Sequence, residues 1–142
     1  INRPGGAAID EVGASAATDI TGFGLAGHLR GICNASKVGA RISFSALPIL
    51  PGVMDLIANG CFPGGTKKNW LYYGQWLDFA PDITMDEKTL VCDAQTSGGM
   101  LICVPAAKAD AMVASLKKHK ALATAVIGEL VADHPGRVAI NR

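Results

Sequence analysis

The chain has 142 residues, 49% of them hydrophobic and 18% charged, and its formal net charge is +1. This composition is typical of one folded domain with its own core, and it excludes a disordered chain. The basic residues are scattered apart from Lys117–Lys120, and the longest apolar run, Met100–Val104, is far too short to cross a membrane, so neither nucleic acid nor a membrane is expected as a partner.

The first elements alternate between helix and strand. Residues 6–12 are expected to end a helix, and Ala16–Asp19 to form a short buried strand that leads into a Gly-rich turn, Thr21–Gly24. A helix is predicted from this turn to about Asn34. Its apolar residues recur at helical spacing and form one stripe: Leu25, Leu29, Ile32 and Cys33.

The middle of the chain predicts fewer regular elements. Arg41–Phe44 alternates between polar and apolar residues and indicates a strand. Pro51 suits the first turn of a short helix that stops at Gly60. Cys61–Pro81 is rich in glycine, asparagine and aromatic residues and is predicted to be a long loop, functional or mobile.

The next segment has clearer boundaries. Thr84–Glu87 is a capping-box pattern that begins a helix to about Val91. Gly99–Val104 predicts a continuous apolar strand, and Pro105 begins another helix. The apolar stripe of that helix is predicted to be buried: Ala109, Met112, Val113 and Leu116.

Two further strands are predicted at Ala123–Ile127 and Arg137–Ile140. Strands and helices mix through short and long connections, which favours an α+β domain with helices packed on a mixed β-sheet. No repeat or linker divides the chain, so residues 1–142 are expected to be a single domain. The chain lacks an initiator Met and begins in what looks like the middle of a helix, so a fragment of a longer protein is expected.

The turn after the first strand has the features of a phosphate site. Asp19 ends the strand, and Thr21, Gly22, Phe23 and Gly24 lead directly into a helix. The first turn of a helix leaves N–H groups unpaired at its positive end, and glycines let an anion approach. A carboxylate there would repel phosphate but could hold Mg²⁺. Alternatively, Asp19 or Thr21 only caps the helix.

A second motif, Asp93–Gly99, precedes the strand that follows it. Its two glycines permit a close backbone approach, and Thr96 and Ser97 offer hydroxyls. The alternative is a plain helix-to-strand connection in which Asp93 and Thr96 hold the local backbone. Pro63–Asn69 could be another anion-contacting loop with Thr66 and Lys67 as donors, or a solvated turn.

Together these segments resemble the selenophosphate synthetases. Ala17–Leu29, with its Asp-Ile-Thr-Gly-Phe-Gly core, is close to the hallmark of that family. Asp93–Leu101 matches the usual Asp-Pro-Gln-Thr-Ser-Gly-Gly-Leu-Leu except at Ala94 and Met100, where no polar group is lost. Three shorter stretches between them match the family's order and spacing: Leu47–Pro48, Leu50–Gly52 and Pro63–Asn69.

The resemblance implies an enzyme that makes selenophosphate from selenide and ATP with Mg²⁺, releasing AMP and phosphate. In that family the aspartate at the Asp19 position is a magnesium ligand. We therefore expect Asp19 to bind metal. The expected cofactor-binding residues are Thr21, Gly22, Phe23, Gly24 and Thr66.

The family's organisation implies that the chain is a C-terminal domain of the aminoimidazole ribonucleotide synthetase-like superfamily. An N-terminal ATP-binding domain, together with the C-terminal domain's own first strand and helix, would precede Ile1. Family members dimerise through the N-terminal domain, which carries the reactive Cys or selenocysteine. No catalytic residue is therefore expected in this chain, which alone should be inactive, and the full-length protein should be a homodimer.

Two alternatives to this function stay open. The chain could be a non-catalytic binding or interaction module, or belong to another ATP-dependent synthetase or kinase of the same superfamily, which Phe23 and Gln95–Gly99 disfavour. The four cysteines show no metal-ligand spacing, and no disulfide framework is expected, so the cytoplasm is the expected compartment. Cys33 and Cys92 are not expected to be nucleophiles.

Overall fold

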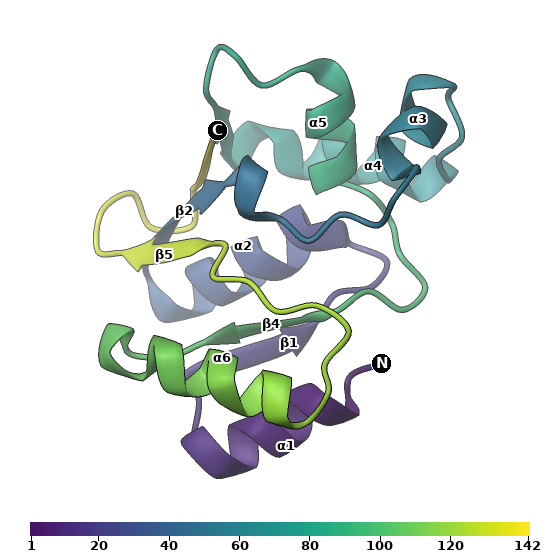
Figure 1. The fold of residues 1–142 in the computed structure, drawn as a ribbon. Helices are drawn as coiled ribbons and strands as arrows, with labels where there is room; N and C mark the ends of the chain where they lie inside the picture. Colours follow the sequence, from purple (N-terminus) through teal and green to yellow (C-terminus); the bar gives the residue numbers. More distant parts are fainter.

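The computed structural model describes residues 1–142 as an α+β domain with six helices and two sheets (Figure 1). This confirms the predicted fold class. The helices are α1 (Arg3–Val12), α2 (Gly24–Ser36), α3 (Val53–Ala58), α4 (Gly64–Tyr73), α5 (Met85–Val91) and α6 (Ala109–Lys118). The strands are β1 (Ala16–Asp19), β2 (Gly39–Ser43), β3 (Leu77–Phe79), β4 (Met100–Cys103), β5 (Gly128–Val131) and β6 (Val138–Asn141).

The two sheets differ in size and direction. β1 and β4 form an antiparallel pair in which Ala16 lies opposite Cys103 and Asp19 lies opposite Met100. The second sheet has the order β3-β6-β2-β5, with β6 parallel to both β3 and β2 and with β5 antiparallel to β2. The larger sheet is therefore mixed, as predicted.

Helix α2 lies between the two sheets, contacting β1 on one side and β2 and β6 on the other (Figure 1). Its predicted apolar stripe supplies much of the core, since Leu29 and Cys33 are almost completely buried against residues such as Ile140. Helices α1 and α6 lie side by side beyond the two-stranded sheet, while α3, α4 and α5 gather at the other end. No helix is both long and apolar enough to cross a membrane.

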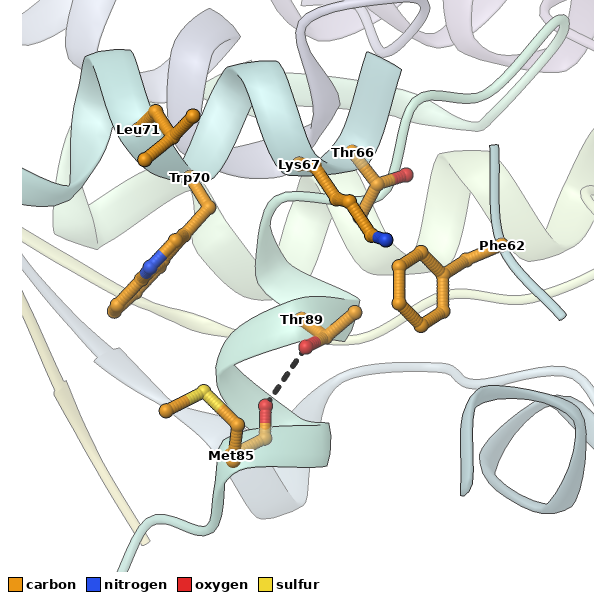
Figure 2. Close-up of a pocket in the computed structure, with 7 residues that line it drawn as sticks. All are labelled: Phe62, Thr66, Lys67, Trp70, Leu71, Met85 and Thr89. Atoms are coloured by element: carbon orange, nitrogen blue, oxygen red, sulfur yellow. Dashed lines mark hydrogen bonds between the residues drawn. The ribbon is translucent and has the colours of Figure 1, made fainter. Parts of the chain in front are cut away.

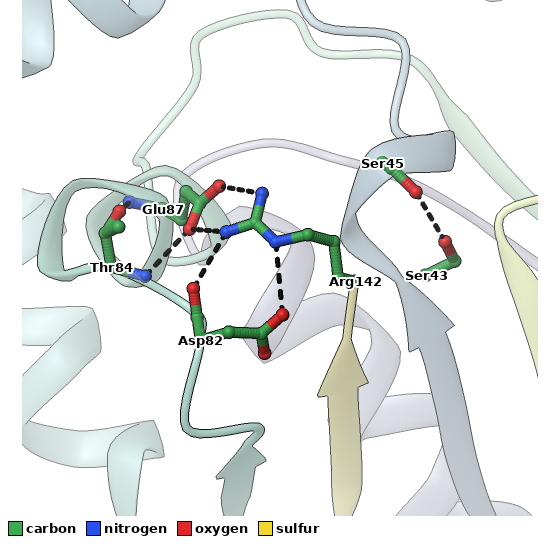
Figure 3. Close-up of polar contacts among 6 residues, drawn as sticks. All are labelled: Ser43, Ser45, Asp82, Thr84, Glu87 and Arg142. Carbon is green, nitrogen blue, oxygen red and sulfur yellow. Dashed lines mark hydrogen bonds and ion pairs between the residues drawn. The ribbon is translucent and has the colours of Figure 1, made fainter.

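The capping box predicted at Thr84 is present and begins α5. The Thr84 hydroxyl accepts from the Glu87 N–H at 3.3 Å, and the Glu87 carboxylate accepts from the Thr84 N–H at 2.7 Å. Arg142 adds an ion pair to Glu87 at 3.0 Å and another to Asp82 at 3.3 Å (Figure 3). Ser43 and Ser45 share a hydrogen bond nearby. This network ties the start of α5 to the residue after β6.

The predicted long loop at Cys61–Pro81 is wrong, because α4, a short 3₁₀ turn and β3 occupy it. Helix α4 has no apolar stripe to reveal it: its buried residues are Thr66 and Asn69, while Leu71 is 80% exposed. Strand β3 has three residues and depends on its parallel partner β6, so no local pattern identifies it.

The last strands of the prediction are partly wrong. The strand expected at Ala123–Ile127 lies instead at Gly128–Val131, the exposed edge of the larger sheet. A Cβ on Gly128 would collide with the carbonyl of Arg41, so the absence of a side chain lets the two strands approach. The strand predicted at Arg137–Ile140 is confirmed as β6.

Two other predictions need smaller corrections. In α6, Met112 is buried as expected, but the second buried residue is Ser115, and the other three predicted stripe residues are only partly covered. Strand β2 begins at Gly39, and Phe44, predicted to end it, lies buried in a 3₁₀ turn.

Candidate functional site

The turn between β1 and α2 leaves a group of backbone donors unpaired. Gly24, with φ at 67°, donates its N–H to the Thr21 carbonyl at 3.0 Å. The N–H groups of four residues have no partner within the chain: Gly22, Phe23, Leu25 and Ala26. Unpaired donors at the start of a 13-residue helix, where the helix dipole is positive, give this turn the chemistry of an anion site.

His28 closes the turn from within α2. Its Nε2 accepts from the Thr21 N–H at 3.1 Å and lies 3.2 Å from the Thr21 hydroxyl, while Nδ1 is 3.5 Å from the Thr18 hydroxyl. The Thr21 N–H is therefore already used by the protein. The donors left in the predicted Thr21–Gly24 set are those of Gly22 and Phe23.

The second sequence motif packs directly against this turn. Ile20 exchanges backbone hydrogen bonds with the two glycines of the motif, donating to the Gly99 carbonyl and accepting from the Gly98 N–H, both at 2.9 Å. The Gln95 N–H donates to the Thr21 carbonyl at 3.1 Å. A Cβ on Gly98 would lie 2.6 Å from the Ile20 carbonyl oxygen, so only glycine fits there. Asp93–Gly99 and the turn after Asp19 therefore form one site.

Helix α4 adds two buried polar side chains to the same place. The Asn69 amide donates to the carbonyls of Gly22 at 2.8 Å and Cys92 at 3.0 Å. The Thr66 hydroxyl donates to the Asp93 carboxylate at 3.0 Å and accepts from the Ala94 N–H at 3.1 Å. Sequence reasoning singled out Thr66 but missed Asn69, whose only signal was its place at the end of the Pro63–Asn69 segment.

The structure places Thr66 behind the turn, away from solvent. Its side chain is 1% exposed, and its hydroxyl hydrogen is engaged by Asp93. A cavity of about 270 Å³ opens between α4 and α5, and both Thr66 and its neighbour Lys67 line it (Figure 2). The Lys67 ammonium lies 5.7 Å from the Phe62 ring centre. The lining of this cavity is mainly apolar, with Trp70 and Met85 at its wall, unlike a phosphate site.

Asp19 lies at the exposed end of β1. Its carboxylate makes no hydrogen bond or ion pair within the chain, so both oxygens are available to a cation. No group of three or more His, Cys, Asp or Glu side chains is placed to hold a metal. Mg²⁺ is commonly held by one or two carboxylates plus substrate phosphates. The residues present therefore fit a single ligand to such an ion and not a complete protein cage.

Burial sets the protonation of the groups behind the turn. It raises the pKa of Asp93, and the hydrogen bond from Thr66 opposes that rise. Burial also raises the pKa of the Cys92 thiol to about 12 and that of Cys33 to about 11. Both thiols are protonated at neutral pH, and a thiol must lose its proton to attack. Neither cysteine is an activated nucleophile.

A second cavity, of about 520 Å³, opens beside the turn. Phe23, His28 and Tyr73 contribute to its lining, and the Phe23 side chain is 57% exposed. Gly27 lies beneath them, where a Cβ would come within 2.7 Å of both Phe23 and Tyr73. The Tyr73 ring meets that of Phe23 edge to face, with centres 6.2 Å apart. An aromatic hollow therefore adjoins the unpaired backbone donors.

Residues 4–141 match the family described as AIR synthase related protein, C-terminal domain. The chain belongs to this family. It is also similar to proteins named selenide, water dikinase: 44% identical over 92% of this chain in Photobacterium profundum, 44% over 83% in Shewanella baltica, and 43% over 99% in Yersinia pestis. The chain spans 37%, 32% and 39% of the length of these relatives. The resemblance drawn from the motifs is confirmed, and the AIR synthase-related match accounts for the α+β fold.

Proposed function

We propose that this chain is the C-terminal domain of an enzyme that makes selenophosphate from selenide and ATP, releasing AMP and phosphate. The similarity to selenide, water dikinases supports the activity, and the match to little more than a third of their length supports a longer parent protein. The N-terminal ATP-binding domain of that parent would precede residues 1–142. A homodimer, a cytoplasmic location, and the absence of nucleic acid and membrane partners belong to the same proposal.

One observation carries this proposal: the two motif segments that resemble the family meet at a single turn with unpaired donors. Gly22 and Phe23 offer N–H groups in the turn that follows Asp19, whose side chain is exposed at the end of β1. Contact with a phosphate oxygen would suit these donors, because a helix N-terminus favours negative charge. Thr66 would act indirectly, since its hydroxyl contacts Asp93 and Ala94.

Asp19 is proposed as one ligand of a Mg²⁺ ion. When bound, the ion would neutralise charge on the phosphates of ATP. The remaining ligands would come from the nucleotide and from the rest of the parent protein. Within this chain the contributions are then positional: Asp19 would orient the cation, and the turn would orient phosphate.

The test is selenide-dependent formation of AMP by the full-length parent and by this chain alone. The parent should convert ATP to AMP only when selenide and Mg²⁺ are present. The chain alone should form none, because phosphoryl transfer depends on positioning and charge neutralisation that one carboxylate cannot supply. An inactive parent would refute the proposed activity, and AMP formation by the chain alone would refute its division between the two domains.

A further inference from the structure

The inner face of α4 is polar. Its two buried residues are Thr66 and Asn69, whereas Leu71 on the same helix is 80% exposed. Resting on the proposed function, we propose that Thr66 and Asn69 are positioning residues. They fix the phosphate-binding turn and the Asp93 segment relative to each other without touching substrate.

Asn69 joins two segments that are far apart in the sequence. Its amide nitrogen has two hydrogens, and each meets a carbonyl, one from Gly22 in the turn and one from Cys92 before the second motif. Removing the amide would leave two carbonyl oxygens facing a 7% exposed position without a donor. Buried acceptors without partners are costly, so the two segments would move apart to reach water.

Thr66 holds the other end of the same junction. A hydroxyl can donate and accept at once, and this one does both, toward the Asp93 carboxylate and the Ala94 N–H. Valine has nearly the same shape but can do neither. The hydrogen bond from Thr66 also offsets part of the cost of burying the Asp93 charge.

The backbone contact between the segments leaves little tolerance for movement. A Cβ on Gly24 would lie 2.8 Å from both the Asp93 carbonyl oxygen and the Cys92 carbonyl carbon, so the turn and the second motif are already in close contact. A shift of the Asp93 segment would therefore also displace Gly24 and the unpaired backbone N–H groups next to it. Small displacements of positioning groups are expensive in catalysis, with losses on the order of 100-fold for about 1 Å.

The first test compares Thr66→Val and Thr66→Ser in the full-length parent protein, with kcat and KM for ATP measured where circular dichroism shows every variant folded. Thr66→Val should lower kcat/KM by roughly 10- to 100-fold. Thr66→Ser keeps the hydroxyl and should recover most of that loss. Thr89→Val is the matched control, because the Thr89 hydroxyl bonds only to Met85 within α5, and its kcat/KM should be unchanged.

The second test covers the case in which Thr66→Val does not fold. Asn69→Ala should then give the same fall in kcat/KM, with Asn59→Ala as its control, since the Asn59 amide bonds only to the Asp55 carbonyl at 2.8 Å. In both tests the loss of kcat/KM should be larger than the loss that the unfolded fraction of the variant would cause by itself.

Several results would overturn the inference. A normal kcat/KM in Thr66→Val or Asn69→Ala would refute the positioning role. A Thr66→Ser variant no more active than Thr66→Val would also refute it, because the effect would then come from packing and not from the hydroxyl. In each of these cases the wild-type parent is still active, so the proposed function survives. A wild-type parent that forms no AMP from ATP and selenide would remove both.

Discussion

Two regions of this molecule are joined by opposite kinds of interaction. At the candidate site, α4 is tied to two motif segments by buried contacts to the backbone, through Asn69 and Thr66. Between α1 and α6, the exposed carboxylate of Glu11 accepts from three side chains near the end of α6: Ser115 at 2.7 Å, Lys118 at 2.6 Å and His119 at 3.0 Å.

The difference bears on what each region can do. Buried hydrogen bonds to the backbone fix a single geometry, because no water replaces a lost partner. Exposed ion pairs contribute little each and are screened by salt. We therefore expect the site to depend on geometry and the contact between α1 and α6 to depend on pH and salt.

The largest expected effect comes from Asp19 in the parent protein. Asp19→Asn keeps the size of the side chain but removes the charge that would attract Mg²⁺. Turnover should fall roughly 100-fold, with partial rescue at high Mg²⁺, while the melting temperature barely changes. Steady-state kinetics over a range of Mg²⁺ concentrations would measure this.

Asp93→Asn is the control for that experiment. Asparagine still offers a carbonyl oxygen to the Thr66 hydroxyl, so the junction at α4 should persist and turnover should fall less. Near-normal turnover of Asp19→Asn at ordinary Mg²⁺ would refute the metal role, and a cap would not replace it, because no side chain caps α2.

The next effect tests how tightly the turn is constrained. Gly24→Ala should lower the free energy of unfolding by about 1–3 kcal/mol, because φ is 67° and the new Cβ would meet the backbone of Cys92 and Asp93. Gly22→Ala, two residues earlier, meets nothing within 4 Å and should cost less than about 0.5 kcal/mol. Urea denaturation would measure both, and equal costs would show that the turn is not held against the second motif.

A smaller effect, of a different kind, is expected from Glu11. Hydrogen bonds from Lys118, Ser115 and His119 lower its pKa to about 2, from an ordinary value of 4.5. The stabilisation is therefore complete above about pH 4.5 and is lost as the pH falls toward 2. Glu11→Gln should lower stability at neutral pH and flatten its pH dependence over that interval.

The control for Glu11 is Glu129→Gln. Glu129 has one exposed ion pair, with Arg41 at 3.5 Å, so its removal should change stability very little. Unfolding measured by denaturant at several pH values would compare the two variants. An unchanged pH profile in Glu11→Gln would show that the contact between α1 and α6 does not rest on this carboxylate.

The smallest effect compares the two regions through their thiols. Cys61 is exposed, Cys103 in β4 is half-buried, and Cys92 beside Asn69 is fully buried. Labelling with a thiol reagent at pH 8 should modify Cys61 first, then Cys103, and Cys92 last. Mass spectrometry of digests would give the order. Early modification of Cys92 would mean that the site opens more readily than its buried hydrogen bonds imply.

Local patterns in the sequence predicted the elements whose signals are local. The limits of β1 are those expected, the stripe of α2 is buried, and the capping box at Thr84 begins α5. Helix α4 could not be predicted in this way, because it is held by polar contacts to distant residues and its exposed Leu71 contradicts amphipathic spacing. Strand β5 was misplaced for a related reason: it is an exposed edge.

The candidate site, too, was predictable only where its signals are local in the sequence. The motifs at Asp19 and Asp93 were visible as short patterns, and the resemblance to a family joined them. Their contact through Ile20 and the bridge made by Asn69 are properties of the folded chain, with no local signal. The burial of Thr66 likewise depends on how α4 packs.

The order of strands in the larger sheet has a consequence for synthesis. Strand β6 follows every other element in the sequence, yet it lies between β3 and β2 and is the only link between them. During synthesis on the ribosome, β3 and β2 cannot pair with β6 until residues near 141 emerge from the exit tunnel. At about 5–20 residues per second, the segment from Phe79 to Val138 takes several seconds to make. A nascent chain stalled in that interval would present strand edges to chaperones, and early termination would leave β3 permanently unpaired.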